Sequence, residues 1–294
     1  MLGRADTLAG VRIAIIGIGN MGEAFARRAL EKGHNVVVWN RTPDRCGPVV
    51  AAGARQATSP GEASSEAEAV LVILADDAAV LEVCLGTEGV LASLGSSGVF
   101  ANVSTVAPST IRHLADAGPA DRVLDSPVMG SPEMIVAGFG SFLIGGSLLA
   151  ITAVEPLWTD LGSGYTHCGP SGTGATMKIV QNMLLITGVA ALAEGIATAR
   201  EHGLSEELIR SVMTDSGVVS PASKVRLASL LDDAHPGWFS PVLARKDIRL
   251  AMDLASQVGL PARIGPAAES LLTTVIDEGK AWPDFAAVIE AFEH

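Results

Sequence analysis

The first forty residues change their hydrophobic pattern from strand to helix and back to strand. Residues 11–16 (VRIAII) form a short, apolar, largely β-branched run, which predicts a buried parallel strand. A helical pattern over 23–32 stops at Gly33, and residues 36–39 (VVVW) predict a second strand. This order predicts a βαβ unit of about thirty residues.

The alternation of strands and helices continues to about residue 170. Further strands are predicted over 69–74, 99–103, 123–124, 142–144 and 165–168, with helices from Ser109 and over 151–161. Strands that alternate with helices favour a doubly wound, mostly parallel sheet, so this part of the chain is predicted to have a Rossmann fold.

After Gly172 the pattern is helical only. Helices are predicted over 175–200, 205–213, 222–231, 241–258, 262–278 and 283–292. The first of these is about 40 Å long at 1.5 Å per residue. The predicted fold class is therefore α/β, with a Rossmann domain over 1–170, an interdomain helix over 171–200 and an all-helical domain over 201–294.

Composition narrows the possible partners. Hydrophobic residues make up 48% of the 294 residues, and the formal net charge is −12. A charge of this sign argues against non-specific binding to nucleic acid or to anionic membranes. The apolar run 179–199 contains Gln181, Asn182 and Glu194, which predict a core helix and not a membrane span.

The cysteines and the start of the chain indicate the compartment. Cys46, Cys84 and Cys168 are far apart and form no CxxC motif, so neither a disulfide framework nor a metal site is predicted. Residues 1–10 lack the charged and apolar regions of a secretory signal. A cytoplasmic location is therefore predicted.

A glycine motif follows the first strand and begins the first helix. It contains Gly17, Gly19, Asn20, Met21 and Gly22. In a dinucleotide-binding turn the first glycine permits the tight turn, the second admits the pyrophosphate, and the third allows helix and strand to pack closely. The motif predicts a dinucleotide site, and the alternative is a glycine turn without a ligand.

The end of the second strand predicts which dinucleotide is bound. An NAD site places Asp or Glu there to hold the ribose 2′-hydroxyl, whereas this chain has Asn40, Arg41 and Thr42. Asn40 does not repel a 2′-phosphate, Arg41 can pair with it, Thr42 can donate a hydroxyl, and Arg45 can assist. NADP is therefore the predicted cofactor, and the alternative is that Arg41 is an ordinary surface arginine.

Other candidate residues follow later strands. Ligands in open parallel sheets bind at the carboxyl ends of the strands. Leu74 and Ala75 are therefore predicted to border the cofactor, and Ser104 and Thr105 to line its nicotinamide side. Capping of the helix from Ser109 is an equally good interpretation of Ser104 and Thr105.

Two polar residues lie one turn apart near the start of the long helix. Gly172 and Gly174 permit close backbone approach, and Lys178 and Asn182 follow at positions i and i+4 on one helix face. An ammonium donor beside an amide suggests a catalytic pair, and the alternative is an ordinary solvated face. His167 is predicted to have a structural role.

These motifs resemble those of the β-hydroxyacid dehydrogenases, which include 3-hydroxyisobutyrate dehydrogenase and the glyoxylate and semialdehyde reductases. The resemblance covers essentially the whole chain. It rests on the glycine motif, Gly33-His34 with residues 40–42, Ser104-Thr105 with Pro108, residues 125–128 with Gly130, Gly172 and Gly174 with Lys178 and Asn182, and Lys246-Asp247.

The resemblance implies roles for several residues. Lys178 would be the catalytic acid/base, Asn182 would orient the substrate, and Lys246 would approach the cofactor with Asp247 beside it. The substrate's carboxylate would lie at a loop that includes Ser126, Val128, Met129, Gly130 and Ser131. Relatives commonly form homodimers or homotetramers through the helical domain, so the same assembly is expected here.

The loop departs from the family pattern D-A-P-V-S-G-G. Met129 replaces the serine and Ser131 replaces the second glycine, which adds apolar bulk where a carboxylate should bind. Residues 129–135 and 142–143 are more similar to those of imine reductases. Imine reductases, however, usually carry Asp or Tyr at the position of Lys178.

These features predict an NADP-dependent oxidoreductase that transfers hydride between the nicotinamide and a small hydroxy acid or its aldehyde- or keto-acid. A free lysine has a pKa of about 10.4, so Lys178 would be charged at neutral pH and suited to reduction. One alternative is an NADPH-dependent imine reductase. Another is a non-catalytic NADP-binding scaffold, which the intact lysine argues against.

Overall fold

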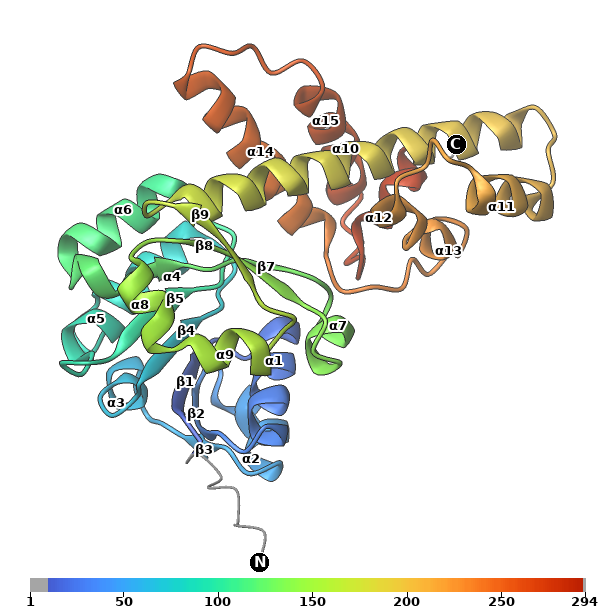
Figure 1. Ribbon diagram of the computed structural model, residues 1–294. Helices are drawn as coiled ribbons and strands as arrows, with labels where there is room; N and C mark the ends of the chain where they lie inside the picture. Colours follow the sequence, from blue (N-terminus) through green and yellow to red (C-terminus); the bar gives the residue numbers. More distant parts are fainter. Residues whose placement is uncertain (1–9, 293–294) are drawn as a thin grey trace, which may run out of the picture. The chain divides into compact units, whose positions relative to one another are not determined.

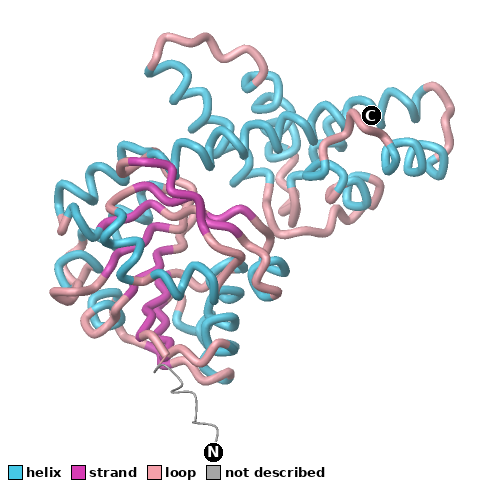
Figure 2. The backbone as a smooth tube through the Cα atoms, viewed as in Figure 1, coloured by secondary structure: helices cyan, strands magenta, loops and turns pink. Residues whose placement is uncertain are grey.

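The computed structural model describes residues 10–292 and divides the chain into two compact units, 1–178 and 179–294. The N-terminal segment 1–9, on which the signal-sequence prediction rests, lies outside the described residues. Helix α10 (Thr173–Glu201) crosses the division between the units. The predicted fold class is confirmed: a Rossmann sheet is followed by an all-helical part, and among residues 10–292 strands lie only in the first unit (Figures 1 and 2).

The first unit contains one mixed sheet in the order β3-β2-β1-β4-β5-β6-β8-β7, with β9 paired to β8. The strands from β3 through to β6 in this order are parallel, whereas β8 is antiparallel to both β6 and β7. The strands are β1 (Arg12–Ile16), β2 (Asn35–Trp39), β3 (Arg55–Gln56), β4 (Ala69–Val72), β5 (Val99–Asn102), β6 (Val123–Asp125), β7 (Val128–Met129), β8 (Ser141–Gly145) and β9 (Tyr165–Gly169).

Helices cover both faces of this sheet, because alternate strand residues point to opposite sides. Ile13 and Ile15 of β1 pack in one cluster, and Ala14 and Ile16 pack in the other. The helices are α1 (Asn20–Glu31), α2 (Gly47–Ala51), α3 (Pro60–Ser64), α4 (Asp77–Leu85), α5 (Val90–Ser93), α6 (Pro108–Ala117), α7 (Pro132–Val136), α8 (Leu148–Ala153) and α9 (Glu155–Asp160).

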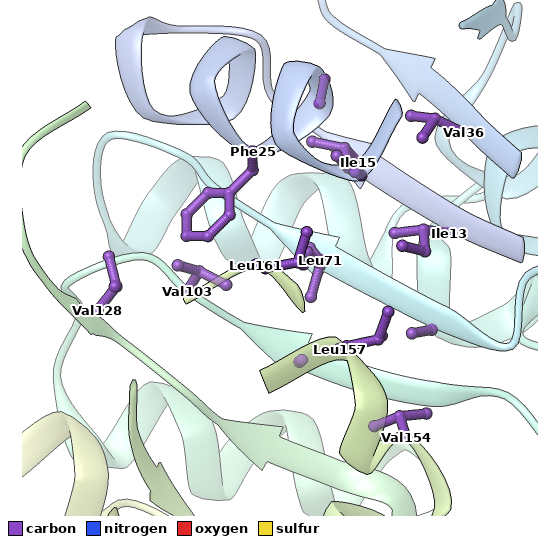
Figure 3. Packing of buried hydrophobic residues seen from close by; sticks show 14 of the residues in the cluster. Ile13, Ile15, Phe25, Val36, Leu71, Val103, Val128, Val154, Leu157 and Leu161 are labelled. Atoms are coloured by element: carbon purple, nitrogen blue, oxygen red, sulfur yellow. The ribbon is translucent and has the colours of Figure 1, made fainter. Parts of the chain in front are cut away.

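Aliphatic side chains and the ring of Phe25 pack together in the cluster on the α1 face (Figure 3). The ring of Phe25 lies 5.8 Å from that of Phe142, which lies 5.1 Å from Trp158. An aromatic side chain in a protein core typically buries roughly 150–250 Å² of surface. The chain of rings therefore joins α1, β8 and α9 in one core.

The second unit is built from helices around a third core cluster. Its α10 segment buries Ile186, Val189, Ala193 and Ile196 in that core. Within the described residues α10 is also long and apolar enough to cross a membrane by length and composition, a test that core helices of soluble proteins pass too. The other helices are α11 (Glu206–Asp215), α12 (Pro221–Lys224), α13 (Leu227–Leu230), α14 (Pro241–Gln257), α15 (Gly265–Asp277) and the 3-10 helix η3 (Phe285–Phe292).

Two predicted helices are each broken into two. The helix predicted over 151–161 ends at Ala153 and begins again at Glu155, because Pro156 lacks the N–H that would continue the ladder. The helix predicted over 222–231 is interrupted between α12 and α13 at Arg226, whose guanidinium donates to Asp284 at 3.0 Å.

Several shorter elements also differ from the prediction. The strand predicted over 69–74 ends at Val72, so Leu74 lies in the following loop. The segment predicted as α-helix over 283–292 is a 3-10 helix in the structure. Strands β3 and β7 and helix α7 were not predicted, because segments of two to five residues are too short to show a hydrophobic period.

The three cysteines are free thiols in different surroundings. Cys46 and Cys84 are buried, whereas Cys168 in β9 is half-buried. Burial raises the pKa of the Cys84 thiol to about 12. Burial and the nearby charge of Asp125 raise the pKa of Cys168, although a backbone hydrogen bond opposes the shift.

Candidate active site

The glycine turn after β1 is packed against the backbone of its own unit. Gly17 has φ +100°, and a Cβ atom added to it would lie 2.2 Å from the carbonyl oxygen of Ile73. A Cβ atom on Gly22 would lie 1.9 Å from the carbonyl oxygen of Gly17. These two glycines are therefore required by close packing, as the motif predicts.

The second glycine of the motif, Gly19, has open space where its side chain would be. No heavy atom lies within 4 Å of a Cβ atom built on it. Gly19 is the N-cap of α1, and no side chain caps the helix there. The first N–H groups of a helix lack intrahelical partners, so this end of α1 suits the pyrophosphate of a dinucleotide.

We expect Gly17→Ala to destabilise the protein by about 2–5 kcal/mol, because alanine resists the positive φ and its methyl group would overlap the Ile73 carbonyl. Gly33→Ala is the matched control. Gly33 also has a positive φ, +81°, but open space around it, so its replacement should cost only about 1 kcal/mol. Urea unfolding measures both, and equal losses would contradict the packing argument.

Asn40 joins the glycine turn to the loop after β2. Its Oδ1 accepts a hydrogen bond from the N–H of Ile18 at 2.9 Å, and its Nδ2 donates to the carbonyl oxygen of Thr42 at 2.9 Å. Asn40 was predicted from the sequence as a cofactor ligand, but both ends of its amide are used within the protein. In this structure Asn40 therefore holds the 40–42 loop against the turn.

Arg41 and Arg45 follow Asn40 in the chain, and both are exposed on the surface. Thr42 is exposed beside them. Within residues 10–292 no hydrogen bond or ion pair of the Arg41 or Arg45 side chain is found. Their position after β2 fits the recognition of a phosphate group, for which a guanidinium offers paired donors.

The loops after β4 and β5 are tied together by Ser104. Its hydroxyl accepts from the N–H of Leu74 at 2.8 Å and donates to the carbonyl oxygen of Val72 at 3.2 Å. The capping interpretation is wrong for Ser104, whose hydroxyl is used in these two bonds. Helix α6 begins at Pro108 without a side-chain cap from its N-cap residue, and Asp77 accepts from the N–H of Ala107 at 2.8 Å instead.

The predicted substrate loop, residues 126–131, has regular structure. Ser126 is fully buried and donates its N–H to Asn102, and Val128 pairs with Phe142 across β7 and β8. Met129 lies in β7, and Gly130 follows with φ +150°. The Ser131 hydroxyl accepts from the N–H of Met134 at 3.2 Å as the N-cap of α7. Of the predicted loop residues, only Met129, Gly130 and Ser131 are partly exposed.

Asp125 holds the start of α10, a role that the sequence did not indicate. Its carboxylate is buried and accepts from the N–H groups of Gly172 at 2.8 Å and Ala175 at 2.7 Å. Burial raises its pKa, although hydrogen bonds from Gly172, Ala175 and Gly174 oppose that shift. Gly145 leaves room for it, since a Cβ atom there would lie 2.5 Å from the carboxylate. The buried carboxylate of Asp125 therefore holds the first turn of the helix that carries Lys178.

Asn182 is buried, so the interpretation as a solvated polar pair is wrong for it. Its Nδ2 lies 2.6 Å from Oδ2 of Asp247 in α14, and the Nζ of Lys246 lies 2.8 Å from Oδ1 of the same aspartate. Lys178 lies four residues before Asn182 on α10 and is half-buried. Nε2 of His167 contacts the carbonyl oxygens of Gly146 and Gly169, as expected of a structural histidine.

A cavity of about 320 Å³ lies elsewhere in the first unit, at the amino ends of the strands. It is lined by Arg12, His34, Arg55 and Glu66 among others, and by none of the predicted site residues. Within residues 10–292 no group of three or more His, Cys, Asp or Glu is arranged to hold a metal ion. The features that suit a dinucleotide lie at the opposite, carboxyl ends of the strands.

Comparison with protein families gives two matches that together span the chain. Residues 12–169 match the NAD binding domain of 6-phosphogluconate dehydrogenase. Residues 172–292 match the family described as "NAD-binding of NADP-dependent 3-hydroxyisobutyrate dehydrogenase".

Individual relatives agree with the family matches. The chain is 31% identical over 292 residues to glyoxylate/succinic semialdehyde reductase 2 of Arabidopsis thaliana, covering 98% of this chain and 81% of the relative. The structure of 3-hydroxyisobutyrate dehydrogenase from Mycobacterium tuberculosis with L-serine has a TM-score of 0.82 at 26% identity, covering 97% and 100%. An imine reductase from Myxococcus stipitatus shares the fold, with a TM-score of 0.65, 19% identity and coverage of 96% and 99%.

Proposed function

Because the chain belongs to the β-hydroxyacid dehydrogenase family and is therefore an NAD(P)-dependent oxidoreductase of hydroxy acids, we propose that it uses NADP. We propose that it acts as a reductase of a small aldehyde- or keto-acid, with Lys178 as the general acid. The cofactor, the direction of the reaction and the proton donor are the three proposed features.

The single observation that supports NADP is the loop after β2. A chain that binds the ribose 2′-hydroxyl of NAD uses a carboxylate there. In this chain Arg41 and Arg45 expose their guanidinium groups, and Asn40 holds the loop against the glycine turn. An arginine at this place attracts a 2′-phosphate through charge-assisted hydrogen bonds.

The proposed reaction needs a hydride and a proton. NADPH supplies the hydride when it is bound, and the N–H groups at the start of α1 with Gly19 hold its pyrophosphate. The ammonium of Lys178 stabilises the negative charge that develops on the carbonyl oxygen and donates a proton to it. The neutral amine then takes a proton from solvent, which completes the cycle.

An imine reductase is the second candidate, and it is favoured by the loop 129–131. Met129 places a thioether where a carboxylate-binding loop carries a hydroxyl, and the Ser131 hydroxyl already caps α7. Fewer polar groups are therefore left for a substrate carboxylate. Lys178 is present in either case, so this candidate differs in substrate and not in hydride donor.

The deciding experiment is NADPH oxidation across a panel of semialdehydes, glyoxylate, β-keto acids and cyclic imines. Turnover of the acids with no turnover of imines is the expected result. Turnover of cyclic imines alone would replace the first candidate by the second. NADPH binding without turnover of any member would instead indicate a non-catalytic scaffold.

We also propose that the chain forms a homodimer or homotetramer through its helical unit. Large apolar side chains on α11 support this, since Leu208 and Val212 are 47% and 54% exposed one turn apart. Light scattering after gel filtration should give a mass of at least twice 30.1 kDa. A monomer at micromolar concentration would contradict the proposal.

A further inference from the structure

One buried carboxylate contacts two of the residues implicated in the site. Asp247 lies in α14 and is 2% exposed. Its Oδ2 is 2.6 Å from Nδ2 of Asn182, and its Oδ1 is 2.8 Å from Nζ of Lys246. All three residues belong to the helical unit, so the arrangement is internal to that unit.

The carboxylate of Asp247 determines which end of the Asn182 amide, the oxygen or the NH₂ group, faces it. An ionised carboxylate only accepts hydrogen bonds, so the atom 2.6 Å away must be the NH₂ group of Asn182. The amide oxygen of Asn182 then lies on the other side, as an acceptor. Without the carboxylate, the two ends of the amide would be nearly equivalent and either could face a ligand.

The same carboxylate forms an ion pair with Lys246. A lysine side chain has four rotatable carbons and loses its position readily unless a partner holds the ammonium. The other two cations near this point of α14 have partners elsewhere: Arg245 donates to Thr273, and Arg249 pairs with Glu269 at 2.6 Å. Among the described ion pairs, Lys246 is the cation that compensates the charge of Asp247.

We propose that Asp247 is a positioning residue of the reaction: it orients the Asn182 amide with its oxygen toward the substrate and holds the Lys246 ammonium in place for the cofactor. The inference rests on the proposed function, since it assigns the substrate to Asn182 and the cofactor to Lys246. Asn182 then accepts a hydrogen bond from the substrate or from a donor beside it. Stabilisation of the developing oxyanion is left to Lys178.

The kinetic test is a double-mutant cycle. Asp247→Ala and Asn182→Ala should each lower kcat by about 10- to 100-fold, and the double variant should be no worse than either single variant. Losses that multiply in the double variant would show that Asp247 does not act through Asn182. Arg249→Gln is the matched control, because it breaks an ion pair on the same helix and should leave kcat unchanged.

The binding test concerns Lys246. Asp247→Ala should raise the Kd for NADPH by about 5- to 10-fold in a fluorescence titration without substrate. Asp247→Asn keeps only one acceptor oxygen, which can face Asn182 or Lys246 but not both. This variant should therefore restore either the kcat or the NADPH affinity, and not both. An unchanged Kd in Asp247→Ala would overturn the role assigned to Lys246.

A third readout needs neither turnover nor a folded variant. In the cofactor-free wild-type protein, the side-chain NH₂ protons of the buried Asn182 should exchange slowly with solvent in ¹⁵N NMR spectra. Those of Asn35 should exchange fast, because Asn35 is exposed and its NH₂ group donates only at 3.5 Å. Equally fast exchange at both would overturn the proposal. If the wild-type protein turns over none of the panel substrates but shows the protected NH₂ group, the proposed function fails while the orientation of Asn182 stands.

Discussion

Replacement of Lys178 by alanine is expected to lower kcat for carbonyl reduction by about 10²- to 10⁴-fold, with the Kd for NADPH changed little. The reason is that the proposed role of the ammonium is to donate a proton, a contribution made in the transition state and not in cofactor binding. Steady-state kinetics with the best panel substrate measures the first quantity, and fluorescence titration measures the second.

Two further variants make this result specific. Lys178→Arg keeps the positive charge but supplies no proton near neutral pH, so we expect it to recover only a small part of the lost rate. Lys32→Ala removes an exposed lysine at the end of α1 and should leave kcat unchanged. If Lys178→Ala retained the wild-type rate, the assignment of the general acid would be wrong.

The second large effect is expected at the loop after β2. Arg41→Ala should raise the KM and Kd for NADPH by about 10- to 100-fold and change those for NADH by less than about twofold, because only NADPH carries the 2′-phosphate that the guanidinium is proposed to pair with. The difference should shrink as the salt concentration rises, since an exposed charge pair is screened.

The control for Arg41 is Arg55→Ala. Arg55 is also exposed, but it is the first residue of β3 and pairs with Glu62 at 2.7 Å. Its loss should leave both cofactor affinities as they were. Equal weakening of NADPH and NADH binding in Arg41→Ala would show that the arginine supports the fold of the loop and does not read the phosphate.

The fold was largely predictable because its main signals are local. The apolar run of β1, the glycine turn and the amphipathic α1 follow one another within a short stretch, and each has its own period. The long α10 was predicted for the same reason. The hydrophobic pattern did not reveal very short elements such as β7. It also did not reveal the break that a single proline makes in a continuous apolar pattern, as at Pro156.

The side-chain contacts of the site were less predictable because the partners are distant in sequence. Asn40 meets Ile18 across 22 positions, Ser104 meets Leu74 across 30, and Asn182 meets Asp247 across 65. Periodicity carries no information on such pairs. The sequence shows only that these polar residues follow strand ends or lie on α10, whereas the hydrogen bonds by which Asn40 and Ser104 hold neighbouring loops together became visible only in the fold.

The three thiols are buried to different extents, so one of them can be labelled selectively. Cys46 and Cys84 are buried, so an alkylating dye should reach Cys168 alone. The labelling needs a pH above neutral, because the pKa of Cys168 is raised as well and the thiolate is the reactive form. Cys168 lies on β9, close enough to Asp125 for that charge to shift its pKa. A fluorophore at this one position would therefore report, without further engineering, on the anchor from which α10 begins.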